Sequence, residues 1–297
     1  MGSYPPSPGF PAPSSETAQP ELAADPAQQA ELRAVLERLP TEENPDGSRS
    51  AAKPGSRSWA YAPATYVLLG INCAVFIAML LNHISWMAPT AQQLVDWGAT
   101  DSMKVLYSGQ WFRIITAMFV HVGIVHLATN MWCLWNLGLL GEPLLGPFGV
   151  FAAYILAGAA GNLLSISVNL AFGVNSVGAG ASGAVFGLAG VLIVLLKSPR
   201  LPIPPKELRG LRRYVIYFAA INFVVGFGGN FFFSSVQVDN WAHLGGFLGG
   251  ILFALPLVPM LGSPKPLFLF RRRVATGLLS GVLIFFGYFI SVVFPVR

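Results

Sequence analysis

The chain has 297 residues, of which 54% are hydrophobic and only 10% are charged, and its mean hydropathy is +0.60. Soluble domains carry about 25% charged residues, so this composition excludes an ordinary soluble protein and predicts an all-α polytopic membrane protein. The formal net charge of +5 does not indicate nucleic-acid binding, because the basic residues lie in short loops between apolar runs.

Residues 1–60 are rich in Pro, Ala, Ser and Glu and contain no long apolar segment. Such a composition buries too little apolar surface to fold by itself. We therefore expect a disordered or partly helical cytoplasmic tail, with one candidate helix at residues 28–39. No signal peptide or organelle-type leader is recognisable in it, so we expect the first span to direct insertion and favour a bacterial plasma membrane.

Seven apolar segments follow, and hydropathy predicts that each spans the membrane. They are residues 64–81, 117–140, 148–168, 182–196, 214–227, 241–261 and 275–295. If they alternate in direction, all Lys and Arg residues except Lys104, Arg113 and Arg297 lie on one side. The positive-inside rule then places the N-terminus in the cytoplasm and the C-terminus outside.

The first external connection, residues 82–116, is long, half apolar and rich in Trp. Tryptophan concentrates at the headgroup boundary, so we expect this connection to lie in the membrane interface. A soluble cap is the alternative. The two cysteines, Cys73 and Cys133, lie within apolar spans and indicate neither a disulfide framework nor a metal site.

Polar side chains at membrane depth are costly, and they usually have partners or a function. His126 and Asn130 lie four residues apart on the second span and share one helix face. His243 opens the sixth span and Ser182 opens the fourth. At about 1.5 Å per helical residue, Ser182, His126 and His243 all lie roughly 22–24 Å above the cytoplasmic boundary. A common depth indicates one site near the external face.

Ser182 stands between glycines, in the sequence Gly180-Ala181-Ser182-Gly183. A helix that starts there places the hydroxyl beside unpaired amide groups and the positive end of the helix dipole, which suits a nucleophile and an oxyanion. A serine that only packs or caps the helix is the alternative. Glycines four apart on the sixth span (Gly245 with Gly249, Gly246 with Gly250) and those at 183, 187 and 190 on the fourth predict close helix contact.

Over residues 64–261 the chain resembles the rhomboid family of intramembrane serine proteases. The segment 180–183 resembles the family's nucleophile motif, Ala242-His243-Leu244-Gly245-Gly246 its general-base motif, and His126-Leu127-Ala128-Thr129-Asn130 its oxyanion motif. All three occur in the expected order and on the expected helices. The seventh span is similar to the extra C-terminal helix of the six-plus-one arrangement.

Two further features carry the resemblance. Gly141-Glu142 resembles the glycine–glutamate end of the family's second helix. Trp111-Phe112-Arg113 is similar to the tryptophan–arginine motif of the first loop, but a phenylalanine separates the two residues.

The resemblance implies a catalytic dyad, with Ser182 as nucleophile and His243 as general base. Phe186 would stack on His243, and Gly180 and Gly183 would support the dyad. The amide of Ser182 and the side chains of His126 and Asn130 would hold the oxyanion. No cofactor or metal is implied.

The implied partners are the bilayer and membrane-protein substrates, which are cut in or near their transmembrane segments; the sequence predicts no oligomeric state. We expect the fifth helix and the loop after it to form a lateral gate, with Phe231, Phe232 and Phe233 as gate residues or simply membrane anchors. The predicted organisation is a tail at 1–60, a rhomboid-like catalytic domain at 61–262, and a basic loop with an additional helix at 263–297. A catalytically inactive rhomboid-like protein that binds membrane clients, and a transporter, remain as alternatives.

Overall fold

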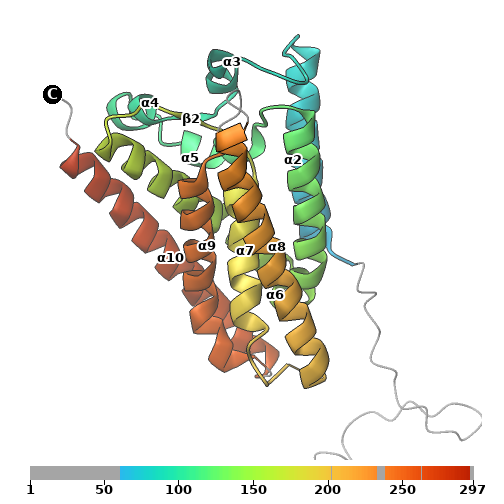
Figure 1. Cartoon of the computed structure of the whole chain (residues 1–297). Helices are drawn as coiled ribbons and strands as arrows, with labels where there is room; N and C mark the ends of the chain where they lie inside the picture. Colours follow the sequence, from blue (N-terminus) through green and yellow to red (C-terminus); the bar gives the residue numbers. More distant parts are fainter. Residues whose placement is uncertain (1–60, 202, 233–237, 262, 295–297) are drawn as a thin grey trace, which may run out of the picture. The chain divides into compact units, whose positions relative to one another are not determined.

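The computed structural model describes residues 61–297 apart from 202, 233–237, 262 and 295–297, so the expectation for the tail at 1–60 lies outside the described residues. The described chain is built almost entirely of helices (Figure 1). The longer helices are α2 (Pro63–Leu81), α6 (Ile124–Ala171), α7 (Ser182–Leu195), α8 (Pro205–Phe232), α9 (Asn240–Ala254) and α10 (Lys265–Val293).

Short elements connect α2 to α6 and follow α6 and α9. They are α3 (Ala91–Asp96), β1 (Thr100–Asp101), α4 (Ser102–Tyr107), α5 (Arg113–Thr116), η1 (Ala117–Phe119), β2 (Val177–Gly178) and η2 (Leu255–Met260). The two strands pair antiparallel, with Thr100 opposite Gly178. This pairing ties the first external connection to the segment that precedes α7.

In the described part of the chain, four helices are long and apolar enough to cross a membrane: α2, α6, α10 and the stretch Asn240–Pro259. Helix α6 has 48 residues and carries two of the predicted spans, because the backbone leaves the helical region at Gly146, where φ is +71°. Helix α7 is apolar but has only 14 residues. The chain is thus an all-α, multi-pass integral membrane protein, and the predicted fold class is confirmed.

The start of the second span differs from the prediction. Residues 117–119 form η1, and α6 begins only at Ile124, because Gly123 has a φ of +147° that does not continue a helix. A Cβ at Gly123 would lie 2.8 Å from the carbonyl oxygen of Met87, so this position also requires close backbone approach. His121, which the predicted span 117–140 includes, therefore lies on the connection before α6 and not on the helix itself.

Helix α9 packs against α7 on one side and α6 on the other through glycines. A Cβ added at Gly246 or Gly250 would come within 2.0 Å of a backbone oxygen of α7. A Cβ at Gly245 would lie 2.8 Å from the Ala160 oxygen of α6, and one at Gly249 would lie 2.7 Å from the Ala160 side chain. The close contact that these glycine pairs predict is confirmed, and it brings the first turns of α7 and α9 together.

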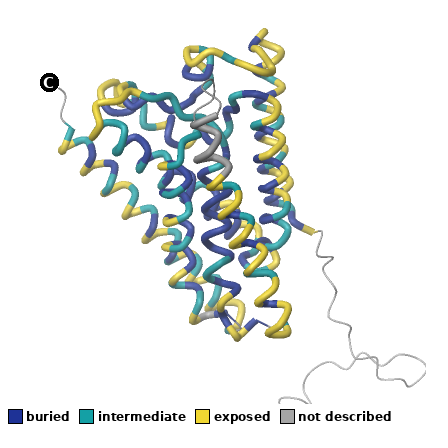
Figure 2. The backbone as a smooth tube through the Cα atoms, in the orientation of Figure 1, coloured by how far each residue is buried: buried dark blue, intermediate teal, exposed yellow. Residues whose placement is uncertain are grey.

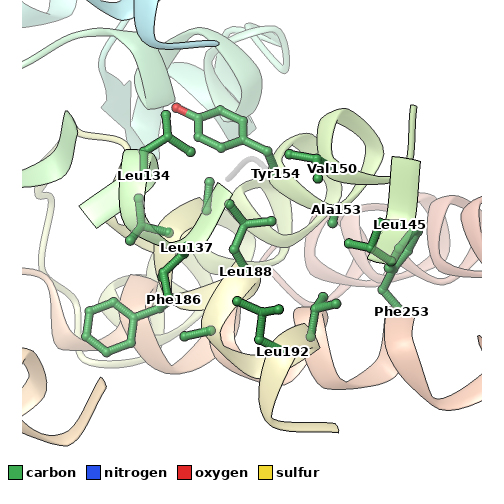
Figure 3. Packing of buried hydrophobic residues seen from close by; sticks show 14 of the residues in the cluster. Leu134, Leu137, Leu145, Val150, Ala153, Tyr154, Phe186, Leu188, Leu192 and Phe253 are labelled. Carbon is green, nitrogen blue, oxygen red and sulfur yellow. The ribbon is translucent and has the colours of Figure 1, made fainter. Parts of the chain in front are cut away.

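The main hydrophobic core surrounds α7, which is buried along almost its whole length (Figure 2). Figure 3 shows its side chains interleaved with those of α6 and α9: Leu188 and Leu192 of α7 lie among Leu137, Leu145 and Val150 of α6, with Phe253 of α9 nearby. The helix that begins with Ser182 is thus the central element of the membrane region.

Glu142 joins α6 to the start of α2, and its side chain is buried. Its carboxylate accepts hydrogen bonds from the amides of Ala64 (2.9 Å) and Thr65 (2.8 Å) and from the Thr65 hydroxyl (2.7 Å). Helix α2 has no side-chain cap at its own N-cap residue, Ala62. A residue of another helix therefore supplies the acceptor that these orphan amides need.

Arg113 organises the first external connection. Its Nη1 donates to the carbonyls of Val95 (2.5 Å) and Ala99 (2.9 Å), and its Nε donates to Gln110. The guanidinium thereby satisfies one carbonyl in the last turn of α3 and one in the segment that follows it. The inserted Phe112 is exposed and lies under the guanidinium, 5.3 Å from its carbon.

Helix α10 contacts α6 near the kink at Gly146 and again towards the C-terminal end of α6. Near the kink, Nη1 of Arg272 donates to the Leu145 carbonyl at 2.5 Å. Further along, Trp111 of the external connection meets α10 at Gly287, where a Cβ would lie 3.3 Å from its ring. The Trp111 contact belongs to a second hydrophobic cluster shared by α4, α5, α6 and α10, with members Val105, Leu106, Ile114, Ala159, Leu163, Ile166 and Ile290.

Candidate active site

Ser182 is the first residue of α7, and no side chain caps this helix. The segment before it is held on three sides: Gly178 pairs with Thr100, the Gly180 amide donates to the Ala117 carbonyl at 2.9 Å, and the Ala181 amide approaches Nε2 of His121 at 3.5 Å. Gly180 has a φ of +132°, which a residue with a side chain rarely adopts. The result is a half-buried hydroxyl beside unpaired helix amides.

His243 is a buried residue in the first turn of α9. Its ring stacks on Phe186 of α7, with centroids 4.4 Å apart and planes 17° apart. Phe186 lies one turn after Ser182, so both face the same neighbour. The backbones also touch here, since a Cβ at Gly183 would lie 3.2 Å from the Ala242 oxygen. Ser182 and His243 are thus on adjoining first turns of two contacting helices.

His126 lies in the first turn of α6 and packs against the turn before Ser182. A Cβ at Gly180 would lie 2.5 Å from Cε1 and 2.9 Å from Nε2 of this imidazole. Asn130 is buried one turn further along, and its Nδ2 donates to the His126 carbonyl at 3.0 Å. The side chain of Asn130 retains a second N–H on the same nitrogen. The two residues predicted to share a face thus lie beside the turn that leads into Ser182.

The N-termini of α6, α7 and α9 all lie at this site, at one end of the helices in Figure 1. His126, Ser182 and His243 each belong to the first turn of one of them. Unpaired amides and the helix dipole make such a terminus favourable for negative charge. Three converging termini therefore create an environment suited to a developing oxyanion.

His121 is a residue near the site that sequence reasoning did not place there. It is fully buried, and its ring centroid lies 5.3 Å from that of His126. Its Nδ1 lies 3.3 Å from the Phe119 carbonyl, and its Nε2 faces the Ala181 amide. These partners fit a neutral ring with the proton on Nδ1. His121 and His126 are five residues apart, so helical periodicity gave no signal for their contact.

The structure describes the surroundings of His243 but not the side chains of the expected gate. Within the described residues, Nδ1 of His243 has no hydrogen-bond partner and no group of three or more His, Cys, Asp or Glu could hold a metal. Phe231 and Phe232 fall at the end of α8, where side chains are not described, and Phe233 lies outside the described residues. The expected gate therefore remains a prediction.

The sequence profile described as the Rhomboid domain matches residues 108–260. The chain is similar to Rhomboid protease GluP of Bacillus subtilis (strain 168), with 31% identity over 225 residues that cover 76% of this chain and 40% of that protein. It is also similar to RHOMBOID-like protein 6, mitochondrial, of Arabidopsis thaliana, with 32% identity over 184 residues, or 61% of this chain and 56% of that protein.

A third relative is Rhomboid-like protease 5 of Toxoplasma gondii, with 32% identity over 176 residues, or 58% of this chain and 19% of that protein. The matched parts lie in the region that holds the site. In each case the chain spans less than two thirds of the relative's length.

Proposed function

Because the chain belongs to the rhomboid family, we propose that it is an intramembrane serine protease in which Ser182 is the nucleophile and His243 the general base. The observation that carries the proposal is the stack of His243 on Phe186, at 4.4 Å, one turn after Ser182. This stack supports an imidazole held at the level of the serine hydroxyl.

In the proposed reaction, Oγ of Ser182 attacks the scissile carbonyl carbon while His243 takes the hydroxyl proton. The imidazolium then donates that proton to the leaving amine, and a water molecule hydrolyses the acyl-enzyme by the same sequence. The ring of Phe186 stabilises the imidazolium through its electron-rich face. Stacking thus takes on part of the orienting and stabilising role that a carboxylate has in a triad.

The oxyanion of the tetrahedral intermediate is held by the amide of Ser182 and the side chains of His126 and Asn130. The position of His126 against Gly180 supports this role, as does the uncapped N-terminus of α7. Donors fixed before the reaction need no reorganisation as charge develops, which is why removal of one typically costs about 10²–10³ in rate.

The substrates are transmembrane segments of other membrane proteins. A peptide bond within a helix is shielded by side chains and by the helix's own hydrogen bonds, so cleavage favours segments that unwind easily and have small residues at the cut. We propose that α8 and the loop after it, with Phe231, Phe232 and Phe233, form the lateral gate.

The proposed domain organisation is a cytoplasmic tail at 1–60, the catalytic domain at 61–262 and an additional helix at 263–297, in a bacterial plasma membrane. The basic residues that follow α7 lie at the end of this helix opposite Ser182, and the positive-inside rule assigns that end to the cytoplasm. The site then faces the outer leaflet, with the N-terminus inside and the C-terminus outside.

The test is cleavage of a transmembrane substrate by the full chain in liposomes. Ser182→Ala and His243→Ala should each abolish cleavage while the protein stays folded. Ser102→Ala is the control, because Ser102 likewise occupies the first position of a helix, α4, but is itself fully buried, and cleavage should continue. Retained cleavage in Ser182→Ala would overturn the proposal; a wild-type chain that binds such segments without cutting them would favour an inactive client-binding protein.

A further inference from the structure

Asp239 immediately precedes α9, and its carboxylate bonds to two different helices. Oδ1 accepts a hydrogen bond from the Ala242 amide at 2.9 Å, which caps the N-terminus of α9. Oδ2 accepts a hydrogen bond from the Ser165 hydroxyl of α6 at 2.5 Å. One side chain therefore both defines where α9 begins and fixes that beginning against α6.

The backbone of Asp239 connects the cap to His243. Its carbonyl accepts a hydrogen bond from the His243 amide at 3.2 Å, closing the first turn of α9. The Cα of His243 is consequently one hydrogen-bonded turn from the capped residue. A change in the position or winding of this turn displaces the imidazole directly.

The anchor continues towards the nucleophile. Nδ2 of Asn169 donates both to Oγ of Ser165 (3.2 Å) and to Oγ of Ser176 (2.5 Å). The first of these bonds occupies a lone pair of Ser165 and leaves its proton directed at Asp239. Ser176 immediately precedes β2, on the segment that leads to Ser182. A continuous set of hydrogen bonds thus links the start of α9 to the approach to α7.

No side chain among the described residues hydrogen-bonds to Nδ1 of His243, so the ring is oriented by its stack on Phe186 and by the helix that carries it. We propose that Asp239 is a positioning residue for His243 and that Ser165 is its anchor on α6. The inference rests on the proposed protease function. The carboxylate acts through the backbone of α9 and does not touch the imidazole.

Substitutions at these two residues separate the cap from the anchor. Asp239→Ala removes both bonds, Asp239→Ser keeps a capping oxygen but is too short to reach Ser165, and Ser165→Ala keeps the cap alone. Asp239→Asn retains a capping oxygen and gains an N–H that Ser165 can accept. Because a misplacement of about 1 Å can cost roughly 10² in rate, Asp239→Ala should lower kcat about 10- to 100-fold and leave KM within about twofold.

The experiment measures two quantities on the full chain, below the unfolding temperature of every variant: turnover of a transmembrane substrate and the rate at which a fluorophosphonate modifies Ser182. Both rates should fall in Asp239→Ala, fall less in Ser165→Ala and Asp239→Ser, and recover in Asp239→Asn. Thr90→Ala is the matched control. It removes an N-cap oxygen that accepts from the Gln93 amide at 3.2 Å in α3, a helix that carries none of the proposed catalytic or positioning residues, and both rates should stay at the wild-type value.

The outcomes are distinct. Modification of Asp239→Ala at the wild-type rate, or a rise in KM at constant kcat, would overturn the positioning role while leaving the protease proposal intact. A role limited to stability would reduce only the folded fraction, and the rate per folded molecule would not change; that result also overturns the inference. A wild-type chain that is neither modified nor active contradicts the proposed function itself, and the inference with it.

Discussion

The ring of His243 lies flat on the ring of Phe186, with centroids 4.4 Å and planes 17° apart. The contact joins α9 to α7 at the level where both helices begin. It restricts the imidazole to one plane without a carboxylate partner. The electron-rich face of the Phe186 ring can also stabilise the positive charge that His243 acquires when it acts as the base.

Replacement of Phe186 tests this contact. Phe186→Leu removes the stack and should lower kcat about tenfold with little change in KM, because a stacked cation–π contact contributes about 0.5–2 kcal/mol. Phe186→Tyr keeps the stack and should retain most activity. Phe253→Leu is the control, since Phe253 is fully buried elsewhere on α9; it should lower stability with kcat preserved. Steady-state cleavage kinetics would reveal an unaltered kcat in Phe186→Leu if the stack has no role.

Asn130→Ala tests the oxyanion proposal. Loss of this donor should reduce kcat about 10²–10³-fold and leave KM nearly constant, because the interaction forms only as charge develops. Asn136→Ala is a close control: both asparagines donate Nδ2 to the carbonyl four residues earlier on the same helix, but Asn136 is not in the site. An effect of Asn130→Ala on KM alone would contradict the role.

Gly180→Ala should disrupt the turn before Ser182. The backbone there has a φ of +132°, and the new methyl group would lie 2.5 Å from Cε1 of His126. We expect at least a 100-fold loss of activity, because both Ser182 and the imidazole of His126 would be displaced. Gly173→Ala, at a φ of +67° with no atom within 4 Å, carries only the milder backbone strain of the left-handed α region, about 1–2 kcal/mol, and no collision. Cleavage by the two variants should differ accordingly; equal activities would exclude a role for the His126 contact.

Gly250→Ala should separate α7 from α9. A Cβ at this position would lie 1.9 Å from the Gly187 oxygen, and backbone cannot yield as a flexible side chain can. Both the thermal unfolding midpoint and kcat should fall. Gly281→Ala in α10 meets nothing within 4 Å, so the same change there should stabilise the helix by about 0.5–1 kcal/mol. Unfolding scans in detergent compare the two.

Glu142→Gln should destabilise the chain without acting on the chemistry. Its buried carboxylate accepts three hydrogen bonds from the start of α2, and hydrogen bonds to a charged group contribute about 1.5–3 kcal/mol each. The substitution turns one acceptor into a donor that faces another donor. We expect a loss of about 2–3 kcal/mol in unfolding free energy, with kcat maintained at low temperature. Glu207→Gln, at an exposed position in α8, should leave stability unchanged.

The sequence predicted the features that depend on local composition. The length of the apolar runs predicted the membrane class. Glycine spacing predicted the contact of α9 with α6 and α7, because only glycines allow backbones to approach so closely. The helix start at Ser182 followed from the glycines before it. These signals lie within a few residues of the feature that they predict.

Features that depend on distant partners were not predictable in this way. His121 was assigned to a span because hydropathy does not register the break at Gly123, and its contact with Ala181 joins segments 60 residues apart. The double bonding of Asp239 to α9 and to Ser165 likewise depends on how α6 and α9 pack. Arg113 donates to the carbonyls of Val95 and Ala99, which lie 18 and 14 residues earlier in the chain. The spacing of Trp111 and Arg113 does not predict these partners.

The most direct test is to locate, by peptide mass spectrometry, the residue that a fluorophosphonate modifies in the full-length chain. A single adduct is expected on Ser182 in the wild-type protein and in Ser102→Ala, and it should disappear in His243→Ala. An adduct on a different serine, or one that forms on Ser182 equally fast without the imidazole of His243, would contradict the proposed dyad.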